Sequence, residues 1–314
     1  TDGVDQGDFV FIAGFPGSTF RYRTSDEIAH AQNVRYPEGI ALFEELNAIL
    51  RGHASESDEA AQRLGNYLFS LANQTKNYRG MLDNFETSGL VARKQAESEA
   101  LDQWVQENRR HRRAYESRLN AYYAEVNSRL EGYRRDRLIG LSAYFPQLLR
   151  ASRTAYRLSM ERSKPDVERR RGYQARDEER IRNMLQSLDR GLFLPADRDL
   201  ALAVLGRLQA LPEEQRVGPL DAWIEAQGGL EAAVELLYTE PSLVTEDARL
   251  ALMEMDQEAM ESSEDPWIQL AVAMETWVED RRAEDDRYRG ADTRRLVKSG
   301  TTGGRYDVPE DREP

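Results

Sequence analysis

The chain has 314 residues, with 43 Lys and Arg against 56 Asp and Glu, a net charge of −13 and no cysteine. These counts exclude a disulfide framework, a cysteine nucleophile and a thiolate metal site, and the acidic excess argues against a general nucleic-acid binder. The longest apolar run, residues 9–15, is far shorter than the roughly 20 residues that a membrane span needs, so we expect neither nucleic acid nor a membrane as a partner.

The first residues differ from the rest of the chain. Residues 9–13 (FVFIA) are continuously apolar and end in a Gly-Phe-Pro-Gly sequence, which predicts a buried strand that enters a tight turn. Residues 20–23 (FRYR) alternate and predict the returning strand. Because two strands alone form only a marginal hairpin, we expect residues 1–23 to pair with strands that lie outside this chain.

From Thr24 onward the hydrophobic period becomes helical. Thr24 and Glu27 have the spacing of a capping box, which predicts the start of a helix. Pro37 suits the first turn of a second helix that runs to about Arg51. The sequence therefore changes from a strand pattern to a helical one near residue 24.

Long helices are expected over much of the remaining chain. The pattern predicts helices over about 90–138 and about 139–163, with Gly132 and Pro146 as bends, and apolar stripes continue to Val278. We predict a mainly α, multi-helix domain with long antiparallel helices over residues 24–289. The polar tail, residues 290–314, is expected to be loop or disordered.

Charge is distributed unevenly along the helical region. Residues 107–182 contain 20 Lys and Arg against 11 Asp and Glu, a net of +9, whereas residues 192–289 contain 8 against 23, a net of −15. The first interpretation is two solvated helical regions of opposite sign that pack against one another. The alternative is a basic groove for polyanions, although the helical spacing of the interleaved tyrosines favours core positions over base stacking.

No pattern of catalytic or metal-binding residues is present in the sequence. The three histidines are scattered and no Gly-x-Ser-x-Gly elbow accompanies them. Residues 14–19 lack the Gly-Lys-Ser/Thr ending of a phosphate loop, and no zinc or calcium spacing occurs. We therefore expect no catalytic residue, no metal and no cofactor in this chain. The acidic pairs are expected to be solvated: Glu213/Glu214, Glu246/Asp247 and Asp285/Asp286.

A stripe of polar residues follows one face of the helix predicted after residue 57. Its members have offsets of 0, 4, 7 and 11 and oppose a leucine face: Asn66, Ser70, Asn73 and Asn77. Asparagine is a poor residue for a helix interior, but it offers two donors and an acceptor. The stripe has two interpretations, a polar groove that binds a ligand or an ordinary solvated surface.

Four segments of the sequence resemble a known family. They are residues 7–22 (GDFVFIAGFPGSTFRY), 72–81 (ANQTKNYRGM), 88–94 (SGLVARK) and 265–271 (DPWIQLA). They resemble the bacterial serine dipeptidyl-peptidases of types 7 and 11, most densely before Trp104. The resemblance implies a chymotrypsin-like double barrel with an inserted helical domain, of which residues 1–23 are the end of the first barrel and residues 24–289 the substrate-gating insertion.

The resemblance also implies that the catalytic residues lie elsewhere. In that family the catalytic His and Asp precede the hairpin and the Ser follows the helical insertion, so this chain alone is expected to be inactive. It begins with Thr rather than Met and has no signal peptide, and we expect it to be a fragment of a longer enzyme. The family further implies a periplasmic or secreted location and a homodimer in the intact enzyme.

Within the resemblance, Asn73 has an expected role. An asparagine of the family's helical domain holds the free α-amino group of the peptide, and alignment through Ala72, Lys76 and Gly80 matches it to Asn73. Asn77 and Lys76 are weaker candidates for the same wall. The expected function is therefore the substrate-binding lid of a serine-type dipeptidyl-peptidase that removes dipeptides from free N-termini. The alternative is a non-enzymatic helical scaffold that binds partner proteins through its oppositely charged regions, which would have no need of the hairpin.

Overall fold

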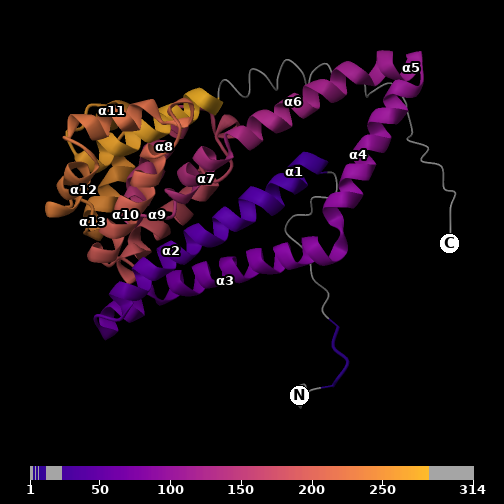
Figure 1. The fold of residues 1–314 in the computed structure, drawn as a ribbon. Helices are drawn as coiled ribbons and strands as arrows, with labels where there is room; N and C mark the ends of the chain where they lie inside the picture. The colour runs from indigo at the N-terminus through magenta and orange to yellow at the C-terminus, as the bar shows by residue number, and fades with distance from the viewer. Residues whose placement is uncertain (1–2, 4, 6, 12–22, 283–314) are drawn as a thin grey trace.

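The computed structural model describes residues 3, 5, 7–11 and 23–282, and over these residues it contains helices and no strand (Figure 1). The mainly α prediction is therefore confirmed. The α-helices are α1 (Ser25–His30), α2 (Tyr36–Ala54), α3 (Asp58–Ser88), α4 (Leu90–Glu107), α5 (Arg109–His111), α6 (Ser117–Glu131), α7 (Tyr133–Leu141), α8 (Gln147–Arg162), α9 (Glu178–Ser187), α10 (Leu194–Gln209), α11 (Gly218–Ala226), α12 (Leu230–Thr239), α13 (Glu246–Ala251), α14 (Gln257–Glu261) and a last helix over residues 266–282.

The predicted capping box starts α1. The Thr24 hydroxyl accepts a hydrogen bond from the Glu27 backbone N–H at 3.2 Å, and the Glu27 carboxylate accepts one from the Thr24 N–H at 2.8 Å. Such reciprocal bonds satisfy two donors that a helix start would otherwise leave without partners. A π-helical stretch (Ala31–Arg35) then leads into α2, where Pro37 occupies the first turn as predicted.

Helices α2 and α3 form a long antiparallel pair (Figure 1). Ser57 caps α3 by accepting from the Ala60 N–H at 3.1 Å, and α3 ends at Gly89, whose φ of 60° is left-handed. The predicted leucine face of α3 is confirmed, since Leu64 and Leu71 are buried against α2 and the body of the protein. Because the leucine face packs inward, the opposite face of α3 points away from the core.

Helices α4, α5 and α6 form an arm that leaves the end of α3 and returns to the body through α7 (Figure 1). The prediction of one helix over about 90–138 is wrong, because the chain breaks at Asn108. The Asn108 backbone is extended and its side chain accepts from the His111 N–H at 2.8 Å, which caps a new helix. The predicted bend at Gly132 does separate α6 from α7.

The boundary predicted between residues 138 and 139 is also displaced. Helix α7 continues to Leu141, a turn follows, and α8 begins directly after Pro146. Proline cannot donate a backbone hydrogen bond and restricts the residue before it, so Pro146 separates two helices here rather than bending one.

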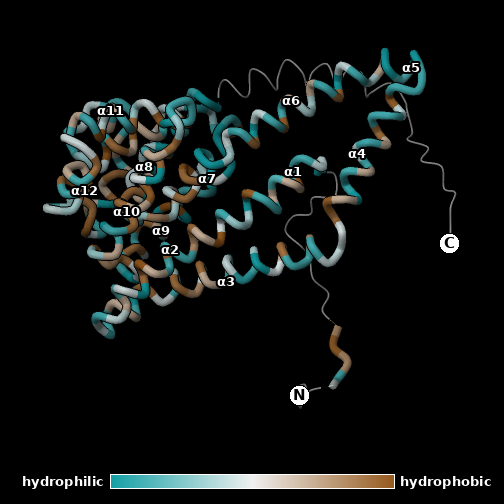
Figure 2. The backbone as a smooth tube through the Cα atoms, in the orientation of Figure 1, coloured by the Kyte–Doolittle hydropathy of each residue, from teal (hydrophilic) through white to brown (hydrophobic). Residues whose placement is uncertain are grey.

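The main core lies among α8, α10, α11, α12 and the last helix, and the inner halves of α2 and α3 pack against it. The stripes predicted in the acidic region point into this core, with Leu200, Val204, Leu208, Val234 and Trp267 all buried. The hydropathy colouring shows apolar residues gathered in the body and a mostly polar arm (Figure 2). None of the helices over residues 23–282 is both long and apolar enough to cross a membrane.

The oppositely charged regions pack on one another, as the first interpretation of the charge pattern predicted. Arg153 and Arg157 of the basic region pair with Glu275 of the acidic region, and Arg170 pairs with Glu279 at 3.0 Å. The charge asymmetry in the sequence therefore corresponds, in part, to contacts within one fold.

The predicted hairpin is not confirmed. Residues 7–11 contain a turn and irregular backbone rather than a strand, and residues 12–22 lie outside the part of the chain that the structure describes. Phe9 and Phe11 are 93% and 82% exposed, so the helical body does not bury this apolar segment.

Deleting residues 1–23 is expected to improve solubility, and so to raise the monodisperse fraction of the protein, with little loss of helicity. Exposed apolar segments of high β-propensity promote association between chains, and Thr24, which caps α1, is retained. The measurement is monodispersity by size-exclusion chromatography beside far-ultraviolet circular dichroism of both proteins. A large loss of helical signal on deletion would show instead that residues 1–23 stabilise the helical core.

Candidate functional site

The polar face of α3 points away from the core. Asn73 and Asn77 are exposed, and neither side chain makes a hydrogen bond within the described residues. At about 100° per residue they lie within about 40° of each other on the helix, opposite the buried Leu64 and Leu71. Both amides are therefore accessible to another molecule.

Lys76 lies on the flank of this face. It is exposed and three residues after Asn73, so it is rotated by about 60° from the asparagine. Gln74, two residues before Lys76, faces α7. Two residues correspond to a rotation of about 200° around the helix axis, so Lys76 points away from α7. Lys76 can therefore reach a ligand bound over Asn73, but it cannot reach the cavity between α3 and α7.

A cavity of about 850 Å³ lies between α2, α3 and α7, and it is called here the α3–α7 pocket. Asn66 and Ser70 of the predicted stripe line it, together with Gln74, whereas Asn73, Lys76 and Asn77 are not among its lining residues. The stripe is thus divided, with two members in the pocket and two on the open surface beside it.

The walls of the α3–α7 pocket come from segments far apart in sequence. Tyr67 of α3 donates to the Gln147 side chain at 2.8 Å, and Gln147 donates to the Gly191 carbonyl at 2.7 Å. A Cβ at position 191 would lie 2.7 Å from the Tyr67 ring, so glycine permits this close approach. Burial raises the pKa of Tyr67, so its hydroxyl stays protonated and able to donate.

The sequence pattern did not predict the arginine and the aromatic rings that line this pocket. Arg137 of α7 has its guanidinium carbon 5.2 Å from the Phe43 ring centre and 5.8 Å from that of Tyr78. Gly39 of α2 leaves room for this contact, because a Cβ there would lie within 2.7 Å of both Tyr78 and Arg137. Tyr78 follows Leu64 by 14 residues, which places it near the leucine face of α3, but nothing in the sequence linked it to Arg137.

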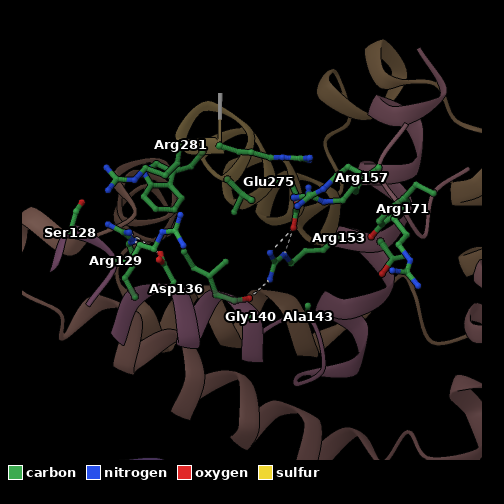
Figure 3. A pocket seen from close by; sticks show the side chains of 18 of the residues that line it. Ser128, Arg129, Asp136, Gly140, Ala143, Arg153, Arg157, Arg171, Glu275 and Arg281 are labelled. Atoms are coloured by element: carbon green, nitrogen blue, oxygen red, sulfur yellow. Dashed lines mark hydrogen bonds and ion pairs between the residues drawn. The ribbon is translucent and has the colours of Figure 1, made fainter. Parts of the chain in front are cut away.

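A second cavity, of about 660 Å³, lies on the other side of α7 (Figure 3). Figure 3 shows Glu275 of the last helix between Arg153 and Arg157 of α8. Arg153 donates to Glu275 at 2.6 Å and to the Ile139 carbonyl at 2.9 Å, and Arg157 pairs with Glu275 and with Glu279. All three side chains of the Arg153–Glu275–Arg157 cluster are at most 6% exposed.

The two buried arginines of this cluster face two carboxylates, those of Glu275 and Glu279. Burial lowers the pKa of Arg153 to about 10, so the guanidinium still carries its charge at neutral pH. Burial also lowers the pKa of Arg157, against which the hydrogen bond to Glu279 acts. A buried charge is tolerated when it is paired and hydrogen-bonded, and the cluster therefore joins α8 to the last helix.

A buried carboxylate holds the start of α8. Asp197 of α10 accepts from the Gln147 N–H at 2.6 Å and from the Tyr238 hydroxyl at 2.8 Å. Burial raises the pKa of Asp197 to about 6, although these hydrogen bonds oppose the shift. Its protonation state therefore changes in a mildly acidic range.

The raised pKa of Asp197 gives an expected pH dependence. Between the ordinary value of 3.8 and about 6 the folded protein binds more protons at this site than the unfolded chain does, so a rise in pH lowers the free energy of unfolding. Between pH 4.5 and 7 this loss should be about 2 kcal/mol. Urea unfolding of the wild type and of Asp197→Asn at both pH values measures it, because other carboxylates titrate in both proteins. A difference between the two that does not change with pH would contradict the prediction.

The histidines form no site in the described residues. The Nδ1 atom of His53 lies 3.1 Å from the Glu56 carboxylate and its Nε2 lies 2.9 Å from that of Asp199, so both ring nitrogens face protein acids. The His111 ring stacks on Trp104 at the tip of the arm. Over residues 23–282 no group of three His, Cys, Asp or Glu is arranged to hold a metal ion.

Known proteins resemble this chain over most of its length. The Asp/Glu-specific dipeptidyl-peptidase of Shewanella putrefaciens is 30% identical over 277 residues, which cover 87% of this chain and 37% of that protein. Dipeptidyl-peptidase 7 of Porphyromonas endodontalis is 32% identical over 108 residues, which cover 34% of this chain and 13% of that protein. The chain therefore spans little more than a third of the length of the first relative.

A solved structure and a protein-family model point to the same group of proteins as these relatives. The crystal structure of Porphyromonas endodontalis DPP11 superimposes with a TM-score of 0.58 at 16% identity, covering 88% of this chain and 39% of that one, which shows a shared helical fold. The family described as Peptidase S46 matches residues 1–299. The resemblance found in the sequence is thereby confirmed, and the chain belongs to the peptidase S46 family.

Proposed function

We propose that this chain is the helical substrate-gating part of a serine dipeptidyl-peptidase that removes dipeptides from the free N-terminus of peptides. Family membership and the names of the relatives support a peptidase role. The catalytic double barrel, with its His, Asp and Ser, would lie in the same polypeptide outside these residues. The intact enzyme would be a periplasmic or secreted homodimer.

In this proposal Asn73 holds the α-amino group of the substrate. The observation that carries it is the position of Asn73 on the exposed face of α3, with an amide that has no partner among the described residues. An amide oxygen can accept a hydrogen bond from an ammonium group without placing a second charge in the site. Asn77, one turn further on the same face, and Lys76 beside it would contact the same peptide.

Binding by the lid and chemistry by the barrels are separate tasks. A fixed contact to the substrate's first residue limits how far the substrate peptide can enter the active site. The peptide bond after the second residue is then placed at the nucleophile. Membership of a peptidase family favours this function over a non-enzymatic scaffold.

The proposal predicts that the 314-residue chain alone does not hydrolyse fluorogenic dipeptidyl substrates, because the catalytic His, Asp and Ser would lie outside these residues. The intact enzyme that contains it should release the fluorophore. The measurement is the initial rate for both proteins at matched concentration after size-exclusion chromatography. An activity that follows the 314-residue chain through the column would contradict the placement of the catalytic residues, and an inactive intact enzyme would contradict the function.

A further inference from the structure

The described residues that line the α3–α7 pocket carry positive charge and include no acidic side chain. Among the described residues that line it are five arginines and no Asp or Glu: Arg35, Arg63, Arg137, Arg150 and Arg190. The whole chain has a net charge of −13, so this concentration of positive charge is local. A concave site with low-dielectric walls strengthens the potential of the charges that line it, and the pocket therefore favours an anionic occupant.

Four of these arginines, Arg137 among them, have no acidic partner in the described part of the chain. Arg63 is held by Glu59 at 3.0 Å and by the Asp189 carbonyl at 2.8 Å. Arg35, Arg150 and Arg190, in contrast, make no ion pair with any residue in the described part of the chain. A guanidinium presents a planar fork of donors that matches a carboxylate, so these side chains can bind one without first breaking an internal pair.

Arg137 is a fixed charge at one end of the pocket. Its guanidinium carbon lies within 6 Å of the ring centres of Phe43, Tyr78 and Tyr133, an arrangement that favours a cation. Its Nη1 donates to the Arg35 carbonyl at 3.0 Å and to the Tyr133 hydroxyl at 2.6 Å, while its Nη2 is buried with no hydrogen-bond partner among the described residues. Among the described residues that line the pocket, no Asp or Glu offsets this charge.

The α3 wall adds a row of neutral polar groups. Asn66, Ser70 and Gln74 line the pocket at intervals of four residues, which places them about 6 Å apart along the helix. Alternate residues of an extended peptide are about 6.6 Å apart, so successive side chains of the row can pair with successive backbone groups that face α3. Such a row suits a peptide, whereas an inorganic anion would use only the arginines.

We propose that the α3–α7 pocket binds a short extended peptide through a carboxylate, which Arg150 and Arg190 hold. The carboxylate can be the C-terminal group or an Asp or Glu side chain, since both present the same two oxygens. This site does not depend on the peptidase reaction, because Asn73 and the substrate's α-amino group take no part in it.

Isothermal titration of the 314-residue chain with three N-acetylated peptides tests the proposal. The peptides are tetra-alanine with a free C-terminus, the same peptide as its C-terminal amide, and an amide in which the third residue is glutamate. Acetylation removes the amino group that Asn73 would bind, so the result is independent of the proposed function. We expect at least one of the two peptides with a carboxylate to bind. The neutral amide should bind at least about tenfold more weakly than that peptide. The two acidic peptides distinguish the C-terminal source from the side-chain source.

Single substitutions locate the site. Arg150→Gln and Arg190→Gln should each lower the affinity for the peptide with a carboxylate by about tenfold or more, because each substitution removes a charge-assisted hydrogen bond. Neither arginine makes an ion pair within the described residues, so both variants should fold, and circular dichroism checks this. Arg93→Gln, on the exposed surface of α4, is the matched control and should leave the affinity unchanged.

Four results would overturn the proposal. The first is that neither peptide with a carboxylate binds, and the second is that the neutral amide binds with the same affinity as they do. The third is that Arg93→Gln lowers the affinity as much as Arg150→Gln and Arg190→Gln do. The fourth is that inorganic phosphate binds and no peptide does. Increasing the NaCl concentration should weaken the interaction, since salt screens exposed charges.

Discussion

Replacing Glu275 with glutamine is expected to lower the free energy of unfolding by about 3–5 kcal/mol. The substitution keeps the shape of the side chain but leaves Arg153 and Arg157 without the carboxylate between them. Both arginine side chains are 6% exposed, so water is a poor replacement for the lost partner. Removing one partner of a buried ion pair leaves an uncompensated buried charge, and that accounts for the size of the effect.

Urea unfolding at neutral pH measures this loss, and Glu279→Gln is its control. Glu279 pairs with Arg157 and Arg170 but is 25% exposed, so water can solvate those arginines when it is replaced. Its loss should be much smaller. If the two variants lose equal stability, or if Glu275→Gln costs less than about 1 kcal/mol, the Arg153–Glu275–Arg157 cluster does not join α8 to the last helix as described.

Replacing Asn73 with alanine in the intact enzyme is expected to reduce kcat/KM for a free dipeptidyl substrate by about 10- to 100-fold. The change removes a hydrogen bond to a charged group, worth roughly 1.5–3 kcal/mol. The melting temperature should not fall, because Asn73 is exposed on α3 and alanine is the better helix former. Steady-state kinetics beside thermal unfolding separates the two effects.

Asn84→Ala is the matched control for this substitution. Asn84 lies eleven residues further along α3, about 20° from Asn73 around the axis but roughly 16 Å away along it, and it is exposed as well. It should retain the wild-type kcat/KM. An Asn73→Ala enzyme with unchanged kinetics, or one that unfolds, would make the polar face of α3 an ordinary surface.

The parts of the fold that sequence predicted are those with local causes. The capping box at Thr24, the proline in the first turn of α2 and the leucine face of α3 each depend on residues within a few turns of one another. The break at Asn108 was missed although its cause is also local. Asparagine there is compatible with a polar helix, and only the backbone geometry shows that it caps a new one.

The pockets depended on contacts between distant segments. Arg153 and Glu275 are 122 residues apart in sequence, and Arg63 bonds to the Leu192 carbonyl 129 residues away. No periodicity links such residues, and arginine on a helix surface is usually solvated. The division of the stripe between the α3–α7 pocket and the open surface follows from the packing of α7, which the pattern of α3 alone does not contain.

Product analysis of a longer peptide by the intact enzyme tests the central claim most directly. An unmodified decapeptide should lose dipeptides in sequence from its free N-terminus, and the same peptide with an acetylated N-terminus should remain uncut over the same period. Mass spectrometry of timed samples follows both reactions. Internal cleavage, release of single residues, or cleavage of the acetylated peptide at an equal rate would contradict a lid that positions substrates by their free amino group.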